Sequence, residues 1–321
     1  MSKQPRVIFD TDMCTDCDDV GAHGILHALA DNGEVEILCC ASSYPDYYVP
    51  GVIDVINTYY ARPDLRVGTW KAPEYRRSER YPKHMSENFP CRIKNADDAE
   101  DAVALYREIL SGQDDGSVTL VTIGGWQNVH DLLRSPSDSH SALNGIELVA
   151  AKLKEWSCMG GFFPDSGENS ETNLKLSGKD KTVWVLENWP EHVKIVFAGG
   201  EIAGAKVGSV LASQTPEDNP VREAYRHFYC VGNQCPWCKG TWPCDHHCAD
   251  LNAVLYAVRG KSPYYGSVDV GHLHYDPETG HNEWRAEPAG NQAYLTHAMP
   301  RAALKRVFEE LLVQPPRGRP A

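Results

Sequence analysis

Hydrophobic positions along the chain follow two spacings, continuous short runs typical of buried strands and the three-to-four-residue spacing of helices. The predicted strands are residues 7–10, 35–41, 118–123, 155–159 and 194–198. The predicted helices are residues 20–30, 49–60, 99–110, 128–133 and 251–258. Strands and helices that follow one another in turn predict an α/β fold, with a single open, mostly parallel sheet flanked by helices.

The last third of the chain has a different pattern. Residues 268–275 and 282–286 are predicted to form a hairpin, and residues 300–312 a closing helix with proline in its first turn. No internal repeat and no linker rich in Pro, Gly or Ser divides the chain. We therefore expect one domain over residues 1–321, with a C-terminal appendage over about 262–314 and a disordered tail over 315–321.

Three of the predicted strands end in a pair of glycines, at residues 124–125, 160–161 and 199–200. Glycine allows tight turns and a close approach of the backbone to another group, although one such pair alone would indicate only a turn. Three pairs at equivalent positions predict that these turns lie beside a common cleft.

Charge and composition narrow the class of partner. Hydrophobic residues make up 42% of the 321 residues, so a substantial core can form. The 44 acidic and 31 basic side chains leave a net charge of −13, which argues against a nucleic acid or an anionic membrane as partner and favours a small, weakly charged substrate. With no membrane-length apolar stretch and no signal-peptide core before the first strand, we expect a cytoplasmic protein.

The densest chemical feature is an acidic segment that directly follows the first predicted strand. It places five carboxylates in ten residues: Asp10, Asp12, Asp16, Asp18 and Asp19. Unpaired carboxylates this close raise one another's pKa values and are costly to bury, so either they splay into water or a cation neutralises them. Open α/β sheets collect ligands at the carboxyl ends of their strands, which favours the cation. Oxygen ligands indicate calcium or magnesium rather than zinc at this place.

This segment resembles the N-terminal aspartate motif of the inosine-uridine-preferring nucleoside hydrolases, usually written DxDxxxDD, with two extra residues before the final pair. Further segments resemble that family's motifs in the same order: the strand and glycine turn over 120–128, the turn over 159–161, residues 170–173, and Asp250. The match spans roughly residues 6 to 260. It implies a Rossmann-like nucleoside hydrolase fold and an enzyme of purine or pyrimidine salvage that splits a ribosyl compound into base and sugar.

The resemblance also implies a calcium site and a catalytic base. A calcium ion would be bound by Asp12, Asp19, the backbone carbonyl of Ile123, and Asp250. The ion would contact two ribose hydroxyls and hold the attacking water, whose pKa it lowers. By the same resemblance, Asp18 would take the proton from that water.

Residues around the sugar follow from the same comparison. The resemblance assigns Glu171, Asn173 and Asn169 to the ribose, where carboxylates and amides stabilise an oxocarbenium-like transition state. The family commonly has an asparagine after its second strand, and its nearest equivalent here is Asp46. Members of the family are often dimers or tetramers, so the resemblance also allows a homo-oligomer.

The chain departs from the family pattern at two places. Asp16 is an alternative to Asp18 or Asp19, because Asp12 to Asp16 has the spacing of the shorter motif; we favour the final pair, which directly precedes the helix. Well-studied members carry a histidine immediately before the distal aspartate, as the acid that protonates the leaving base. Ala249 stands there in this chain, with His246–His247 close by in the sequence.

A second cluster lies shortly before Asp250. Its four cysteines have ligand spacing suited to a structural zinc ion: Cys235, Cys238, Cys244 and Cys248. A loop of free thiols, or a local disulfide under oxidising conditions, explains the same residues. A zinc ion would order the loop that leads to Asp250.

Other readings of the acidic residues remain open at this point. Asp10 and Asp16 are equally well explained as turn formers, and Asp250 as the N-cap of a helix. Asp10-x-Asp12 after a strand also resembles the opening of haloacid-dehalogenase phosphatases, with Asp10 as nucleophile, although Cys14 replaces the usual Thr or Val. A third class is a ribosyl-binding relative that keeps the metal but lacks the acid, as Ala249 permits.

Overall fold

The computed structural model describes residues 4–13, 16–167, 170–231, 240–287 and 290–317. Within these ranges the main sheet has nine strands, in the order β4-β3-β2-β1-β5-β6-β7-β11-β8. All neighbouring strands are parallel except β11 and β8, which are antiparallel. The strands are β1 (Arg6–Thr11), β2 (Glu36–Ser42), β3 (Val67–Thr69), β4 (Glu100–Asp101), β5 (Val118–Thr122), β6 (Leu153–Met159), β7 (Lys194–Ala198), β8 (Tyr265–Val268) and β11 (Gln292–His297). The prediction of a mostly parallel α/β sheet is confirmed.

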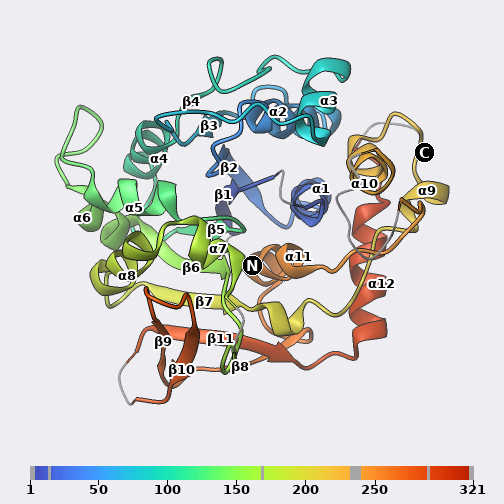
Figure 1. The fold of residues 1–321 in the computed structure, drawn as a ribbon. Coiled ribbons are helices and arrows are strands. Elements are labelled where there is room, and N and C mark those ends of the chain that lie inside the picture. The colour runs from blue at the N-terminus through green and yellow to red at the C-terminus, as the bar shows by residue number, and fades with distance from the viewer. Residues whose placement is uncertain (1–3, 14–15, 168–169, 232–239, 288–289, 318–321) are drawn as a thin grey trace.

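Helices cover both faces of this sheet (Figure 1). One face carries α1 (Asp18–Asp31), α2 (Val49–Tyr59), α10 (Pro220–Cys230), α11 (Ala249–Arg259) and α12 (Arg301–Leu312). The other carries α4 (Ala102–Ser111), α5 (Gln127–Arg134), α6 (Gly145–Lys152) and α8 (Lys179–Asn188). The remaining helices are short: α3 (Tyr81–Asn88), α7 (Thr172–Leu176), η1 (Gly200–Ile202) and α9 (Leu211–Gln214).

The central strand β1 shows why the apolar runs fold in this way. Val7 and Phe9 are buried in the core under α1 and α11, whereas Ile8 is buried in the core under α4 and α5. Side chains alternate between the two faces of a strand, so a strand buried on both faces has a continuous apolar run. β1 lies between β2 and β5, where the chain changes direction across the sheet. Ligands of such folds bind outside the carboxyl ends of the strands at this point.

The C-terminal region confirms one prediction and corrects another. The predicted hairpin is present as a separate two-stranded sheet, β9 (His272–Tyr275) and β10 (Asn282–Arg285). The expected strand over 268–275 is instead split, because Val268 ends β8 and Gly271 adopts a φ of 125°, which interrupts the extended chain. The sequence pattern did not predict β11, which joins β7 and β8 within the main sheet.

Two helix starts also differ from expectation. α12 begins at Arg301 and Pro300 is its N-cap, so the proline precedes the first turn. Cys248 is the N-cap of α11, which places Asp250 inside the first turn and excludes the simple N-cap reading of this residue. The predicted C-terminal helix is otherwise confirmed.

The C-terminal segment is held to the rest of the described chain. β8 and β11 belong to the main sheet, and α12 packs on α1. Of the expected tail, residues 315–317 are described, and the backbone N–H of Arg317 donates a hydrogen bond to Asp31; residues 318–321 lie outside the described ranges. Among the described helices, none combines the length and the apolar character that a membrane crossing requires.

Candidate active site

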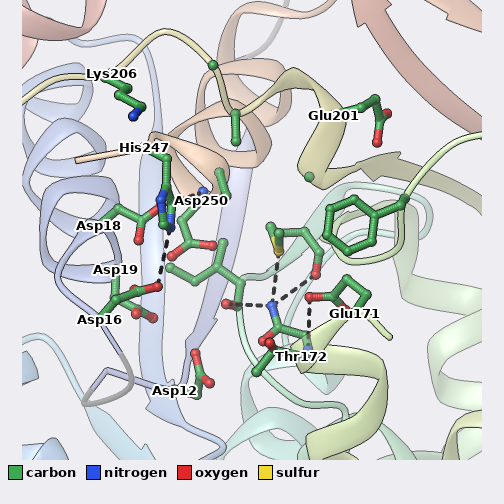
Figure 2. Close-up of a pocket in the computed structure, with 18 of the residues that line it drawn as sticks. Asp12, Asp16, Asp18, Asp19, Glu171, Thr172, Glu201, Lys206, His247 and Asp250 are labelled. Carbon is green, nitrogen blue, oxygen red and sulfur yellow. Dashed lines mark hydrogen bonds and ion pairs between the residues drawn. The ribbon is translucent and has the colours of Figure 1, made fainter. Parts of the chain in front are cut away.

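A cavity of about 650 Å³ opens at the carboxyl ends of the central strands. Asp12 follows β1, Ile123 follows β5, Met159 ends β6, and Gly200 follows β7, so four neighbouring strands deliver residues to its wall. Figure 2 shows the acidic side chains gathered on one wall, with Glu171 and Thr172 across from them. The glycine turns after β5, β6 and β7 therefore lie beside one cleft, as the paired glycines predicted.

The acidic wall is built from two distant segments of the chain. Asp12 lies in the loop after β1, Asp18 and Asp19 open α1, and Asp250 lies in the first turn of α11. None of the four residues is more than 5% exposed. The backbone N–H of Asp250 lies 3.4 Å from Asp18 Oδ2, and Thr11 Oγ1 donates a hydrogen bond of 2.6 Å to Asp19. The contacts between α1 and α11 thus bring the aspartates of the N-terminal motif close to Asp250, the last of the motifs in the sequence.

Burial leaves these carboxylates with excess negative charge. Burial, followed by repulsion from Asp16, raises the pKa of Asp12 to about 8. The pKa values of Asp18, Asp19 and Asp250 are held well above the usual range, first by burial and then by neighbouring carboxylates. Asp12 Oδ2 is buried without a hydrogen-bond partner in the described chain. A cation in contact with these oxygens would relieve both penalties.

The donor set fits a hard cation. Asp16, Asp19 and Asp250 each offer a carboxylate oxygen, and these oxygens lie within 4.8 Å of one another. Calcium takes six to eight oxygen ligands at about 2.3–2.6 Å, so oxygens this close can share one ion. Asp16, which the sequence left as an alternative, joins this group, and Asp12 lines the same cavity. The Ile123 carbonyl faces the site but already accepts a hydrogen bond of 3.1 Å from Asn173 Nδ2.

The opposite wall is organised by a short helix. Glu171 is the N-cap of α7, and its two carboxylate oxygens accept hydrogen bonds from the backbone N–H groups of Asn173 (3.0 Å) and Leu174 (2.9 Å). Burial raises the pKa of Glu171, and these hydrogen bonds oppose that effect. Asn173 Nδ2 also donates to the Met159 carbonyl. Glu171 and Asn173 line the cavity as expected, whereas Asn169 lies outside the described residues.

Two histidines reach the acidic wall from the loop before α11. His247 Nε2 lies 3.6 Å from Asp16 Oδ2, and His246 Nε2 lies 3.6 Å from Asp18 Oδ1. Burial acts to raise the pKa of Asp16, but the adjacent His246 and His247 rings outweigh it and hold this pKa well below the usual range. His247 lines the cavity beside Ala249. The sequence suggested the proximity of these histidines but could not give their reach.

Sequence reasoning missed several residues of the cavity wall, among them one partly buried carboxylate. Glu201 lies in η1, directly after the glycine pair that closes β7, and burial raises its pKa to about 7. Its Oε2 accepts a hydrogen bond of 3.0 Å from the backbone N–H of Phe163. Phe162 and Lys206 also line the cavity. The only signal for Glu201 was its place after the glycine pair, because an isolated glutamate in a loop carries no pattern of its own.

Two aspartates considered earlier lie away from the cavity wall. Asp46 Oδ1 accepts from the Tyr48 backbone at 3.0 Å and Oδ2 from Ser78 Oγ at 2.5 Å, and its substrate-binding role stays a prediction. Asp10 is fully buried, and its Oδ2 accepts hydrogen bonds from Tyr106 and Asn128. These bonds tie β1 to α4 and α5, a position unsuited to a phosphatase nucleophile.

The cysteine cluster is only partly described. Cys235 and Cys238 lie outside the described residues, so the zinc hypothesis stays a prediction. The Cys244 thiol lies 3.7 Å from the Asp245 carbonyl oxygen, and the Cys248 thiol lies 3.5 Å from that of Ala203. Burial raises the pKa of the Cys248 thiol to about 12, which disfavours the thiolate that zinc requires.

Comparison with known proteins identifies the fold. No protein-family model and no curated protein sequence matches the chain. Among solved structures, an inosine-guanosine nucleoside hydrolase matches with a TM-score of 0.69 and 17% identity, covering 97% of this chain and 98% of its own. A plant nucleoside hydrolase matches with a TM-score of 0.68 and 16% identity, covering 98% of this chain and 100% of its own.

A third match comes from a different class of protein. A type III effector protein in complex with adenosine diphosphate ribose has a TM-score of 0.63 and 15% identity, covering 98% of this chain and 93% of its own. These likenesses extend over nearly the whole chain at low identity, so they establish the fold. The resemblance to the nucleoside hydrolase fold that the ordered motifs predicted is confirmed.

Proposed function

We propose that the protein is a calcium-dependent N-ribohydrolase that splits a ribonucleoside or a related ribosyl compound into base and ribose. The observation that carries this proposal is the placement of a buried cluster of aspartates opposite Glu171 and Asn173 in one cavity. Carboxylates that bind a hard cation and groups that hold a sugar therefore meet where a parallel sheet collects its ligands. Salvage of bases in the cytoplasm is the corresponding cellular use.

The aspartate wall would hold the metal. Asp12, Asp19, Asp250 and the Ile123 carbonyl are the proposed ligands, with Asp16 as a further oxygen donor close to Asp19 and Asp250. When bound, calcium supplies a Lewis acid that lowers the pKa of water and contacts the ribose hydroxyls.

Side chains of the protein would transfer the protons and stabilise the positive charge that develops on the sugar. Asp18 is buried beside this wall, and the raised pKa of its carboxyl makes it an effective proton acceptor. Glu171 places negative charge across the cavity, where it would stabilise the cationic sugar that forms as the glycosidic bond breaks. Asn173 links the strand ends after β5 and β6, and so fixes the distance between the two walls.

The leaving base also requires a proton source. Ala249 cannot supply it, but His247 lines the cavity and lies 3.6 Å from Asp16. Burial acts to raise the pKa of Asp16, but His246 and His247 outweigh it and hold this pKa well below the usual range, so His247 lies beside an ionised carboxylate. We assign leaving-group protonation to His247, in place of the histidine that precedes the distal aspartate in the resembled family.

A binding protein without catalysis is the second candidate. Ala249 favours it, because the residue next to the distal aspartate offers no proton. The effector protein with bound adenosine diphosphate ribose shows that a chain of this fold can hold a ribosyl compound larger than a nucleoside. In this reading His247 would have no part in turnover.

Release of reducing sugar from a panel of purine and pyrimidine nucleosides tests both candidates. The assay is run with calcium present and again after chelation. Ribose release that depends on calcium supports the hydrolase and identifies the preferred base. If no nucleoside of the panel releases ribose while calorimetry still detects binding of ribosyl ligands, the hydrolase proposal is rejected in favour of the binding protein.

A further inference from the structure

A second group of possible metal ligands lies beside the aspartates assigned to calcium. Asp16, Asp18, His246 and His247 each offer one ligand atom, and the four atoms lie within 4.8 Å of one another. The two carboxylates come from the loop after β1 and the start of α1, and the two imidazoles come from the loop before α11. This group shares Asp16 with the aspartates assigned to calcium, and it differs from them in its chemistry, because half of its donors are nitrogen.

Three of the separations between these atoms are close to those expected within a small coordination shell. The measured pairs are His247 Nε2 to Asp16 Oδ2 at 3.6 Å, His246 Nε2 to Asp16 Oδ2 at 3.8 Å, and His246 Nε2 to Asp18 Oδ1 at 3.6 Å. Zinc binds nitrogen and oxygen ligands at about 2.0–2.2 Å, which places tetrahedral ligand atoms roughly 3.3–3.6 Å apart.

The surroundings of His246 hold its ring in the orientation that a metal ligand needs. Its Nδ1 lies 2.8 Å from the Tyr229 hydroxyl, so a hydrogen bond at one ring nitrogen directs the other toward the carboxylates. The ring is fully buried and makes edge contacts with Phe228 and Tyr229. Metal-bound histidines almost always have such a partner at the second nitrogen.

The other two ligands give access from solvent. The side chains of His247 and Asp16 are 32% and 31% exposed, and both line the cavity. An ion could therefore enter through the cavity mouth and displace only water. Figure 2 shows His247 above Asp16 and Asp18, on the side of the cavity toward Lys206.

We propose that Asp16, Asp18, His246 and His247 form a second metal site, specific for a divalent transition metal such as zinc, next to the calcium site. Imidazole and carboxylate together favour zinc and related ions, whereas calcium takes oxygen donors only. Asp18 and His247 are also the base and the acid of the proposed hydrolysis. The following consequence rests on that proposed function. A zinc ion bound at this site occupies both side chains, so they can no longer transfer protons, and zinc inhibits the enzyme.

Cobalt is the direct probe, because Co²⁺ replaces zinc and absorbs visible light in a tetrahedral nitrogen and oxygen site. The full-length protein, stripped of metals and then saturated with calcium, is titrated with Co²⁺. One visible-absorbing ion per chain is expected, without the near-ultraviolet band of cobalt bound to thiolate. A thiolate band that disappears in Cys244→Ser would instead place the ion in the cysteine cluster and overturn the proposal.

Variants test the assigned ligands. His247→Ala and Asp16→Asn should each weaken cobalt binding by at least about tenfold, whereas His192→Ala, at an exposed histidine before β7, should leave it unchanged. The circular dichroism spectrum serves as the check on folding for both variants, and calcium binding by calorimetry is a second check for His247→Ala. Unchanged cobalt affinity in both ligand variants, with the fold intact, would refute the site.

Activity separates this proposal from the function on which its consequence rests. Zinc should inhibit ribose release at concentrations that match its binding, with calcium in excess. If the protein binds cobalt at this site but shows no hydrolase activity, the proposed metal site is supported and only the proposed hydrolase function is refuted. Zinc binding that leaves turnover unchanged would contradict the assigned roles of Asp18 and His247.

Discussion

Asp18 combines a buried position with contacts on three sides. Its side chain is 1% exposed, its Oδ1 faces His246, and its Oδ2 faces the backbone N–H of Asp250. Burial, followed by repulsion from the neighbouring carboxylate of Asp16, raises the pKa of Asp18 well above the usual range. Such a group is suited to accept a proton in the transition state.

Replacement of this base should affect turnover more than binding. Asp18→Asn keeps the size of the side chain but cannot accept the proton, so kcat should fall about 10²–10⁴-fold. Initial rates of ribose release give kcat, and calorimetry with ribose or a slowly cleaved nucleoside gives affinity. A variant that keeps most of its kcat would show that another group is the base.

His23 on α1 predicts how stability depends on pH. Its ring is fully buried and stacks on Phe9 with centroids 5.0 Å apart, and burial lowers its pKa to about 3. The unfolded chain binds a proton near pH 6.5 while the folded chain does not, so the free energy of unfolding falls as pH drops through 6.5. Between pH 7 and pH 5 this one residue should remove about 2 kcal/mol.

Urea unfolding at pH 7, 6 and 5 measures this effect. His23→Gln should flatten the decline in the free energy of unfolding, even if its stability at pH 7 is lower. His192→Gln removes an exposed histidine and should keep the wild-type slope. Equal slopes for His23→Gln and the wild type would show that His23 is protonated within the fold.

Residues of the site were predictable where they follow a patterned element. Asp12 and Asp19 lie between the first predicted strand and the first predicted helix, so their place beside the cleft could be expected, whereas Asp250 was assigned to the site only through the family resemblance. The positions of Glu201 and His247 at the cavity were not predictable. Both residues lie in connecting segments, whose geometry depends on tertiary contacts that produce no periodic pattern in the sequence.

At the scale of elements, the turn after β5 fixes the position of Asp12. A Cβ atom on Gly124 would lie 2.6 Å from the backbone nitrogen of Asp12 and 2.8 Å from Ser43 Oγ. Both separations are shorter than real contacts, so the loop after β1 can approach β5 this closely only if residue 124 has no side chain.

Gly124→Ala should therefore disturb the metal site. The methyl group displaces Asp12, and calcium affinity should fall about 10–100-fold, as for other changes that misplace a ligand. Calorimetry of calcium binding measures the loss. Gly112→Ala is the control, because a Cβ there meets nothing closer than 3.6 Å. Equal affinities in the two variants would show that Asp12 is not a ligand.

Two of the strands that the sequence failed to predict, β8 and β11, share a physical cause. β8 has four residues and β11 has six, and both include partly exposed positions, so their apolar pattern is weak. β11 exists because β7 and β8 offer it partners on both sides, and pairing across the sheet is invisible to a local pattern. The sequence predicted β7 with its full bounds, because this strand is buried on both faces and therefore forms a clear apolar run.

For the whole molecule, the aspartate wall connects the first strand to a helix more than two hundred residues later. Metal bound by Asp12, Asp19 and Asp250 would join the loop after β1 to α11, and would stabilise only the folded chain. At a free calcium concentration a thousand times the Kd, the gain is about 4 kcal/mol.

Chelation should therefore lower the melting temperature by several degrees, and added calcium should restore it. Calorimetric scans with and without chelator, at constant ionic strength, measure the shift. Asp250→Asn should melt at nearly the same temperature in both conditions, because the carboxylate is lost. A wild-type protein indifferent to chelation would exclude a tightly bound structural cation.

The place of β11 has a consequence for synthesis on the ribosome. The strand lies between β7 and β8 in the sheet, although it is the last of that sheet's strands along the described chain. Until residue 297 has left the exit tunnel, the nascent chain holds β7 with an unpaired edge, to which another chain could add. A ribosome that pauses once α11 has left the exit tunnel would thus display a finished aspartate cluster on a sheet still open to aggregation, and chaperone capture at that stage would protect the yield of the protein.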